Sequence, residues 1–188
     1  MIDRRGAMAG MVAMFGVAIF PPIARAAGAV QVGFSEISAG PPSTAVFTPP
    51  QRALMTALSE RVMPTTDTPG AIAAGVPEYI EKLLADWALP EDRKPILAGL
   101  DAIDALSRQQ QGKPATALSP EQMDAMLTLA MQDKFPGGGA FFQAFRQMVL
   151  TGYFTSEVGI MQEREYLPVP GRYDGAYPIA NVKRVFSS

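Results

Sequence analysis

The stretch VPEYIEKLLADW, from Val76 to Trp87, decides the fold class. Its large apolar residues recur at i, i+4, i+7, i+8 and i+11, which places them on one face of a helix with about 3.6 residues per turn. A helix with one apolar face needs other elements to cover that face. We therefore predict a helix that begins near Pro77 and turns one face toward a core, a face made of Val76, Ile80, Leu83, Leu84 and Trp87.

Segments on both sides of this stretch have the same helical character. Thr48 and Gln51, and later Ser119 and Gln122, have the spacing of a capping box, and a proline follows each cap. We predict helices from Thr48 to before Pro64, over 91–110, from Ser119 through Ala130, and over 141–162 after the Gly-rich turn 136–139. Their predicted inward residues are Leu54, Leu58 and Val62; Ile96, Leu97, Leu100, Ile103 and Leu106; Met123, Met126, Leu127 and Ala130; and Phe141, Phe145 and Met148.

No segment alternates apolar and polar residues as a half-buried strand does. The sequence therefore predicts an all-α protein, a small helical bundle of about five helices. An extended N-terminal arm over 27–47 precedes the bundle domain over 48–163, and an irregular C-terminal tail over 164–188 follows it.

The composition excludes several kinds of chemistry. The 188 residues include no histidine and no cysteine, so the chain offers no thiolate nucleophile, imidazole base, usual zinc site or haem-attachment motif. The formal net charge of −2 and the lack of a basic stripe argue against nucleic-acid binding. Carboxylates are the main acid–base groups that remain.

Three sets of carboxylates are candidates for acid–base work. Asp101 and Asp104 share a helix face, as do Glu78 and Glu81, and both pairs have the pattern of a solvated face. Glu157 lies beside small residues of the last predicted helix. One alternative for the whole protein is therefore a periplasmic hydrolase that uses Asp101, Asp104 or Glu157. A second is a small-ligand-binding helical protein with an enclosed apolar cavity.

The first 26 residues have the layout of an export signal. Arg4 and Arg5 precede an uncharged stretch, and Ala24 and Ala26 form a small-x-small pattern suited to cleavage. The paired arginines predict a twin-arginine (Tat-type) signal peptide. The alternative is an uncleaved membrane anchor, because the uncharged stretch is just long enough to cross a bilayer.

The tail sequence EYLPVPGRYDGAYP, from Glu165 to Pro178, is rich in proline, glycine and tyrosine. Such a run cannot form a helix or an inner strand, and tyrosine is common at interface hot spots. The last predicted helix also carries Gly152, Ser156 and Gly159 at helical spacing, which lets another backbone come close. These features predict a partner-binding surface; the alternative is a tail that folds back over its own bundle.

Two sequence blocks resemble a known family. LTGYFTSEVGIMQ, from Leu150 to Gln162, with YLPVPGRYDG, from Tyr166 to Gly175, looks like the gluconate 2-dehydrogenase subunit 3 family. The block FTPPQRALMTALSERVMPTTDTPGAIAAGVPEYI, from Phe47 to Ile80, is similar to the N-terminal part of that family. The resemblance covers the chain from about Phe47 to Tyr177.

The resemblance implies a non-catalytic small subunit with no cofactor or metal of its own. It implies a large catalytic partner that contains FAD and is of the glucose-methanol-choline oxidoreductase type, exported with this chain through the Tat route. It also implies a cytochrome c subunit with haem c in the same complex, a periplasmic location, and indirect association with the inner membrane.

We expect the partner interface on the last helix and the tail, with the loop Thr65–Ala71 as a further contributor. The expected interface residues are Gly152, Tyr153, Phe154, Ser156, Glu157, Gly159, Gln162, Tyr166, Pro168, Pro170, Gly171, Tyr173, Asp174 and Tyr177.

Overall fold

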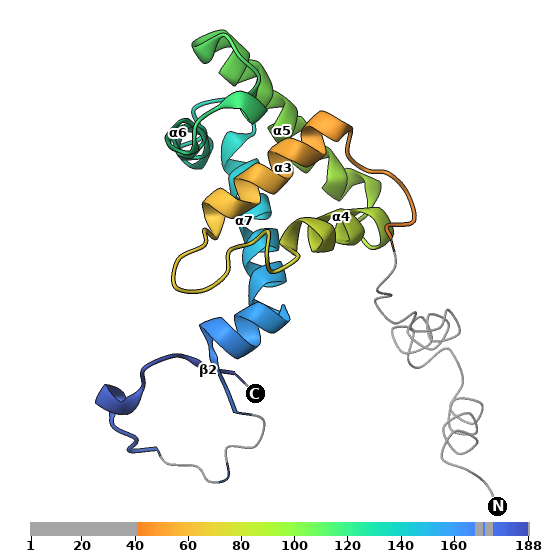
Figure 1. The fold of residues 1–188 in the computed structure, drawn as a ribbon. Coiled ribbons are helices and arrows are strands. Elements are labelled where there is room, and N and C mark those ends of the chain that lie inside the picture. Colours follow the sequence, from red (N-terminus) through yellow and green to blue (C-terminus); the bar gives the residue numbers. More distant parts are fainter. Residues whose placement is uncertain (1–40, 168–170, 172–174, 188) are drawn as a thin grey trace, which may run out of the picture. The chain divides into compact units, whose positions relative to one another are not determined.

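A computed structural model describes residues 41–167, 171 and 175–187. The chain divides into two units, 1–41 and 42–188, and the fold is that of the second unit (Figure 1). The predicted signal residues Arg4, Arg5, Ala24 and Ala26, and most of the predicted arm, lie outside the described residues. The described α-helices are α3 (Pro49–Val62), α4 (Val76–Asp86), α5 (Pro90–Gln111), α6 (Pro120–Met131) and α7 (Gly138–Phe154).

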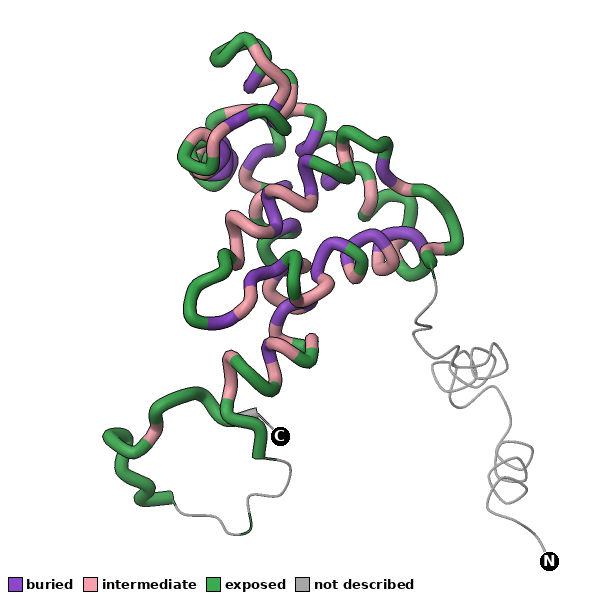
Figure 2. The backbone as a smooth tube through the Cα atoms, in the orientation of Figure 1, coloured by how far each residue is buried: buried purple, intermediate pink, exposed green. Residues whose placement is uncertain are grey.

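The all-α prediction is confirmed, and α7 is the central helix. It packs against α3, α4, α5 and α6 (Figure 1). Its buried face carries the stacked rings of Phe141 and Phe145, whose centres lie 5.4 Å apart. Figure 2 shows the buried residues gathered where these helices meet. Phe47, which the sequence places in the arm, is also buried in this core. Within the described ranges, no helix has the length and apolar character needed to cross a membrane.

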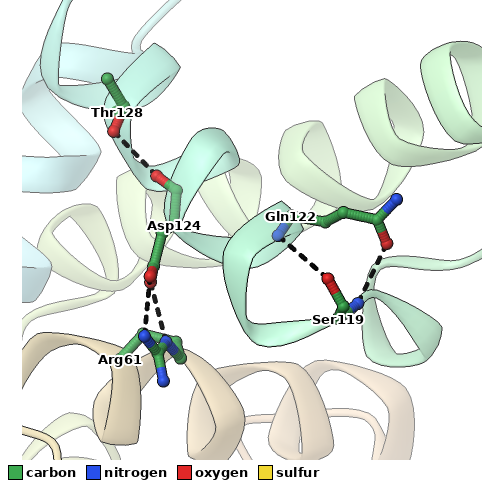
Figure 3. A network of polar contacts seen from close by, with 5 residues as sticks. All are labelled: Arg61, Ser119, Gln122, Asp124 and Thr128. Atoms are coloured by element: carbon green, nitrogen blue, oxygen red, sulfur yellow. Dashed lines mark hydrogen bonds and ion pairs between the residues drawn. The ribbon is translucent and has the colours of Figure 1, made fainter.

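Both predicted capping boxes are present. The backbone N–H of Gln51 donates to Thr48 Oγ1 at 3.4 Å, and Thr48 N–H donates to Gln51 Oε1 at 3.0 Å. Ser119 and Gln122 repeat this exchange at the start of α6, with distances of 3.3 and 3.0 Å (Figure 3). Each box satisfies backbone donors that a helix start otherwise leaves free.

The ion pair between Arg61 and Asp124 joins α3 to α6 (Figure 3). Arg61 Nε and Nη2 donate to Asp124 Oδ1 and Oδ2, both at 2.7 Å. These hydrogen bonds lower the pKa of Asp124 despite partial burial. Both side chains remain partly exposed, so the pair orients the two helices more than it stabilises them.

The predicted face of α4 is correct except at its end. Val76, Ile80 and Leu84 are buried and Leu83 is half-buried, whereas Trp87 is 59% exposed. The prediction that Trp87 points inward is wrong because α4 ends at Asp86 and Trp87, at the C-cap with φ −121°, leaves the helical path. A periodic pattern places a side chain only as far as the helix continues.

The predicted helix over 141–162 is also wrong in its extent. The α-helix ends at Phe154, a turn follows at Thr155 and Ser156, and a π-helical segment η2 (Gly159–Glu163) completes this region. The Ser156 hydroxyl donates to the Tyr153 carbonyl at 2.6 Å and accepts from Gly159 N–H at 3.1 Å. These local bonds replace the regular helical ladder and end α7.

The tail is not fully irregular. Strands β1 (Glu165–Tyr166) and β2 (Phe186–Ser187) pair in parallel, with Glu165 opposite Phe186, and a short 3₁₀ helix η3 (Ile179–Asn181) lies between them. A further 3₁₀ helix, η1 (Ala115–Ala117), connects α5 to α6. Strands of two residues are too short to show alternation in sequence, which explains why the sequence predicted none.

Candidate partner-binding surface

Glu60 holds the loop between α3 and α4 in one conformation. Its Oε1 accepts from the N–H and the hydroxyl of Thr65 at 3.0 and 2.8 Å, and its Oε2 accepts from Ile72 N–H at 2.9 Å. The Thr65 hydroxyl also accepts from Gly70 N–H at 3.0 Å. One carboxylate therefore fixes both ends of the loop that contains the DTPGA sequence.

This loop is fastened to the end of α7. The Tyr153 hydroxyl donates to the Pro69 carbonyl at 2.8 Å, and the Tyr153 ring is fully enclosed. Thr68 is buried, and its hydroxyl donates to Glu163 Oε2 at 2.6 Å. The two sequence blocks that carry the family resemblance thus meet in space.

A cleft of about 530 Å³ opens at this junction. The loop, the end of α7, η2 and the tail all contribute to its walls. The guanidinium of Arg164 lies 4.8 Å from the centre of the Phe154 ring, a cation–π distance. The residues that line the cleft are Asp67, Thr68, Phe154, Glu163, Arg164, Val182, Lys183, Arg184 and Val185.

Exposed apolar side chains recur along η2 and the described tail, two of the segments that contribute to this cleft. We call them the C-terminal apolar surface. The most exposed is Ile179 at 87%, on η3. Figure 2 shows the described tail as largely exposed. The surface consists of Met161, Tyr166, Leu167, Tyr177, Ile179, Val185 and Phe186. Exposed aromatic side chains such as Tyr166, Tyr177 and Phe186 are enriched at binding interfaces.

The predicted small-residue stripe packs against this chain itself. Gly152 is buried under Tyr79, and a Cβ at Gly152 would lie 2.6 Å from Tyr79 Cδ1. A Cβ at Gly159 would lie 2.0 Å from the Tyr153 carbonyl oxygen. At Gly152 the close neighbour is a side chain of α4, and at Gly159 it is the backbone of the preceding turn, so the expected approach of another backbone stays a prediction.

The remaining predicted interface residues fall into three groups. Phe154 and Ser156 are half-buried at the end of α7. The exposed members are Glu157, Gln162, Tyr166, Gly171 and Tyr177. Pro168, Pro170, Tyr173 and Asp174 lie outside the described residues.

The candidate catalytic carboxylates have separate structural partners. Asp101 accepts from Gln51 Nε2 at 2.7 Å, and Glu81 pairs with Arg52. Burial alone would raise the pKa of Asp104, but hydrogen bonds from Ala115 N–H and Arg108 outweigh it and lower that pKa. Glu78 and Glu157 are exposed. A general acid needs a raised pKa, so Asp104 is better explained as a structural anion.

The described part of the chain also contains no group of three or more acidic residues placed to hold a metal ion.

The sequence did not predict several residues of the cleft and of the C-terminal apolar surface. Thr68 and Glu163 have no pattern that links them across the chain. Ile179, Val185 and Phe186 follow the tyrosine-rich stretch on which the interface prediction ended. The adjacent cations Lys183 and Arg184 were a usable signal, because the described segment 175–187 contains no acidic residue to balance them.

The fold and this surface define a small all-helical domain with an exposed apolar end. The family described as gluconate 2-dehydrogenase subunit 3 matches residues 49–171. The chain belongs to this family, which confirms the resemblance seen in the sequence. The chain matches no curated protein and no solved structure.

Proposed function

We propose that this chain is a non-catalytic small subunit that binds and stabilises the catalytic subunit of a dehydrogenase complex. The family name describes a dehydrogenase subunit, which supports membership in such a complex. The catalytic partner in this proposal is an FAD-containing large subunit of the glucose-methanol-choline type, and hydride transfer to the flavin takes place there.

One observation carries the proposal: the C-terminal apolar surface is exposed on η2 and the tail, the segments that follow the contact between the two family blocks. Removing apolar surface from water stabilises an association by about 25 cal/mol per Å² before the entropic costs of binding. Tyrosine and other aromatic residues at such a surface are effective anchors. Tyr166, Tyr177 and Phe186 are exposed and available to a partner.

The proposal includes a role in export. The Arg4–Arg5 pair suits a Tat signal, and the Tat route transports folded proteins, so this chain would carry its bound partner to the periplasm. A cytochrome c subunit with haem c would accept the electrons and hold the complex at the inner membrane. The haem belongs to that subunit, because this chain has no cysteine for covalent attachment.

Co-expression with the catalytic subunit tests the proposal. The full chain should co-purify with the flavoprotein, and a variant that ends at Tyr166 should not, while its circular dichroism remains helical. The full chain's failure to co-purify would contradict the proposed function. Co-purification of the shortened variant would contradict only the assignment of the tail as the binding surface.

A further inference from the structure

The cleft at the C-terminal end contains three cations without a carboxylate partner. Arg164, Lys183 and Arg184 line it, and none of them takes part in an ion pair with another described residue. Arg184 donates to the Gln162 carbonyl, and Arg164 lies over the Phe154 ring. Lys183 is exposed and has no such contact within the described chain. These charges are therefore available to an outside carboxylate.

The two carboxylates that line the same cleft accept hydrogen bonds from uncharged hydroxyls and do not pair with the three cations. Glu163 accepts the hydroxyl of Thr68 at 2.6 Å, and Asp67 accepts the hydroxyl of Thr66 at 3.1 Å. The whole chain has a net charge of −2, so the excess of cations over carboxylates in this cleft is a local feature. A local positive region on an acidic protein favours an acidic partner group.

Apolar walls accompany these cations. Phe154, Val182 and Val185 line the cleft, and Phe186, which follows Val185 in the chain, is exposed. A partner segment that complements both the cations and the apolar walls of the cleft needs a carboxylate with apolar residues next to it. Such a segment would bury its apolar side chains and still pair its charge.

We infer that the cleft receives a protruding acidic-apolar segment of the catalytic subunit, with an Asp or Glu side chain against Lys183. This inference rests on the proposed function and adds the chemistry of the contact. A flat anionic membrane fits less well, because the cations line a concave cleft with apolar walls, which a protruding segment can enter and a flat lipid surface cannot.

Lys183→Glu in the full chain, measured for binding to the purified catalytic subunit, is the first test. Reversal of a charge that faces a carboxylate should raise the Kd about tenfold and reduce the dependence of binding on salt. Lys134→Glu is the matched control, because Lys134 is also exposed but lies before α7, at the end remote from the cleft. It should leave the Kd unchanged, and both variants should keep the wild-type circular dichroism.

Zero-length carbodiimide cross-linking of the wild-type complex is the second test. A cross-link from Lys183 to an Asp or Glu of the catalytic subunit, identified by mass spectrometry, is the expected result. Equal Kd values for Lys183→Glu, Lys134→Glu and wild type, with no Lys183 cross-link, would overturn the inference and leave the proposed function intact. Lys183-dependent binding to vesicles of phosphatidylglycerol and phosphatidylcholine would overturn it in favour of a membrane contact. A wild-type chain that does not bind the catalytic subunit would overturn both.

Discussion

Thr68 donates a 2.6 Å hydrogen bond to Glu163, a residue 95 positions later in the chain. The bond joins the loop after α3 to the π-helical segment after α7. Thr68 also contacts the Tyr153 hydroxyl at 3.4 Å, and that hydroxyl donates to Pro69. The loop is therefore positioned to hold the start of the tail, and with it one wall of the cleft.

Thr68→Ala should destabilise this junction. The substitution leaves the half-buried Glu163 carboxylate without its protein donor, and we expect the free energy of unfolding to fall by about 1 kcal/mol. Thr66→Ala is the control, since Thr66 is exposed and its hydroxyl reaches only Asp67. Urea unfolding measures both. Equal stabilities of the two variants would show that the Thr68–Glu163 bond does not hold the junction.

Gly152→Ala should lower the free energy of unfolding, although it adds only one methyl group. The added methyl group would meet the Tyr79 ring at 2.6 Å, inside a packed contact between α4 and α7, so we expect a loss of about 1 to 3 kcal/mol. Gly139→Ala, in the first turn of α7, would bring its methyl group to 3.2 Å from the Asp133 side chain, an exposed group that accepts the Gly139 N–H. Better helix propensity offsets that contact, so its stability should change by less than about 0.5 kcal/mol. Thermal unfolding measures the stability of both variants. A Gly152→Ala variant as stable as the wild type would refute the tight contact between Gly152 and the Tyr79 ring.

Asp86 should titrate at unusually low pH. The hydrogen bond from Lys82, and then those from Ser43, lower the pKa of Asp86 from 3.8 to about 2. Because the folded pKa is depressed, the ionised carboxylate stabilises the fold above about pH 4, and this contribution is lost as the pH falls through about 2. A carbon-13 NMR titration should give a midpoint near pH 2, and Lys82→Ala should move it upward. A midpoint that Lys82→Ala leaves in place would rule out this cause.

The parts of the fold that depend on local chemistry could be predicted from sequence. The caps at Thr48 and Ser119 and the starts of α3 and α6 depend on residues within one turn of each other. The buried face of α4 follows from spacing alone. Trp87 and the end of α7 could not be predicted, because there the backbone leaves the helix through local bonds, such as that between Ser156 and Tyr153, which compete with the helical ladder.

The candidate surface was predicted in outline for a similar reason. The tyrosine and proline content of the tail indicated an exposed segment, and Tyr166 and Tyr177 are exposed. The glycines at 152 and 159 indicated a close contact, but their spacing does not say which neighbour comes close. The Thr68–Glu163 bond, the pairing of Glu165 with Phe186 and the cleft between them arise only from the three-dimensional fold.

Ile179→Ser should weaken the complex without affecting the fold. Ile179 is 87% exposed and contributes nothing to the core, so its loss matters only if a partner covers it. Complete burial of such a side chain contributes about 1.5 to 3 kcal/mol, which corresponds to an increase in Kd of roughly 10- to 100-fold. Leu89→Ser is the matched control, because Leu89 is 57% exposed just before α5 and lies outside the C-terminal apolar surface. Isothermal titration calorimetry with the catalytic subunit should show a weaker complex for Ile179→Ser alone; equal weakening by both variants would mean that the partner covers more of the molecule than its C-terminal end.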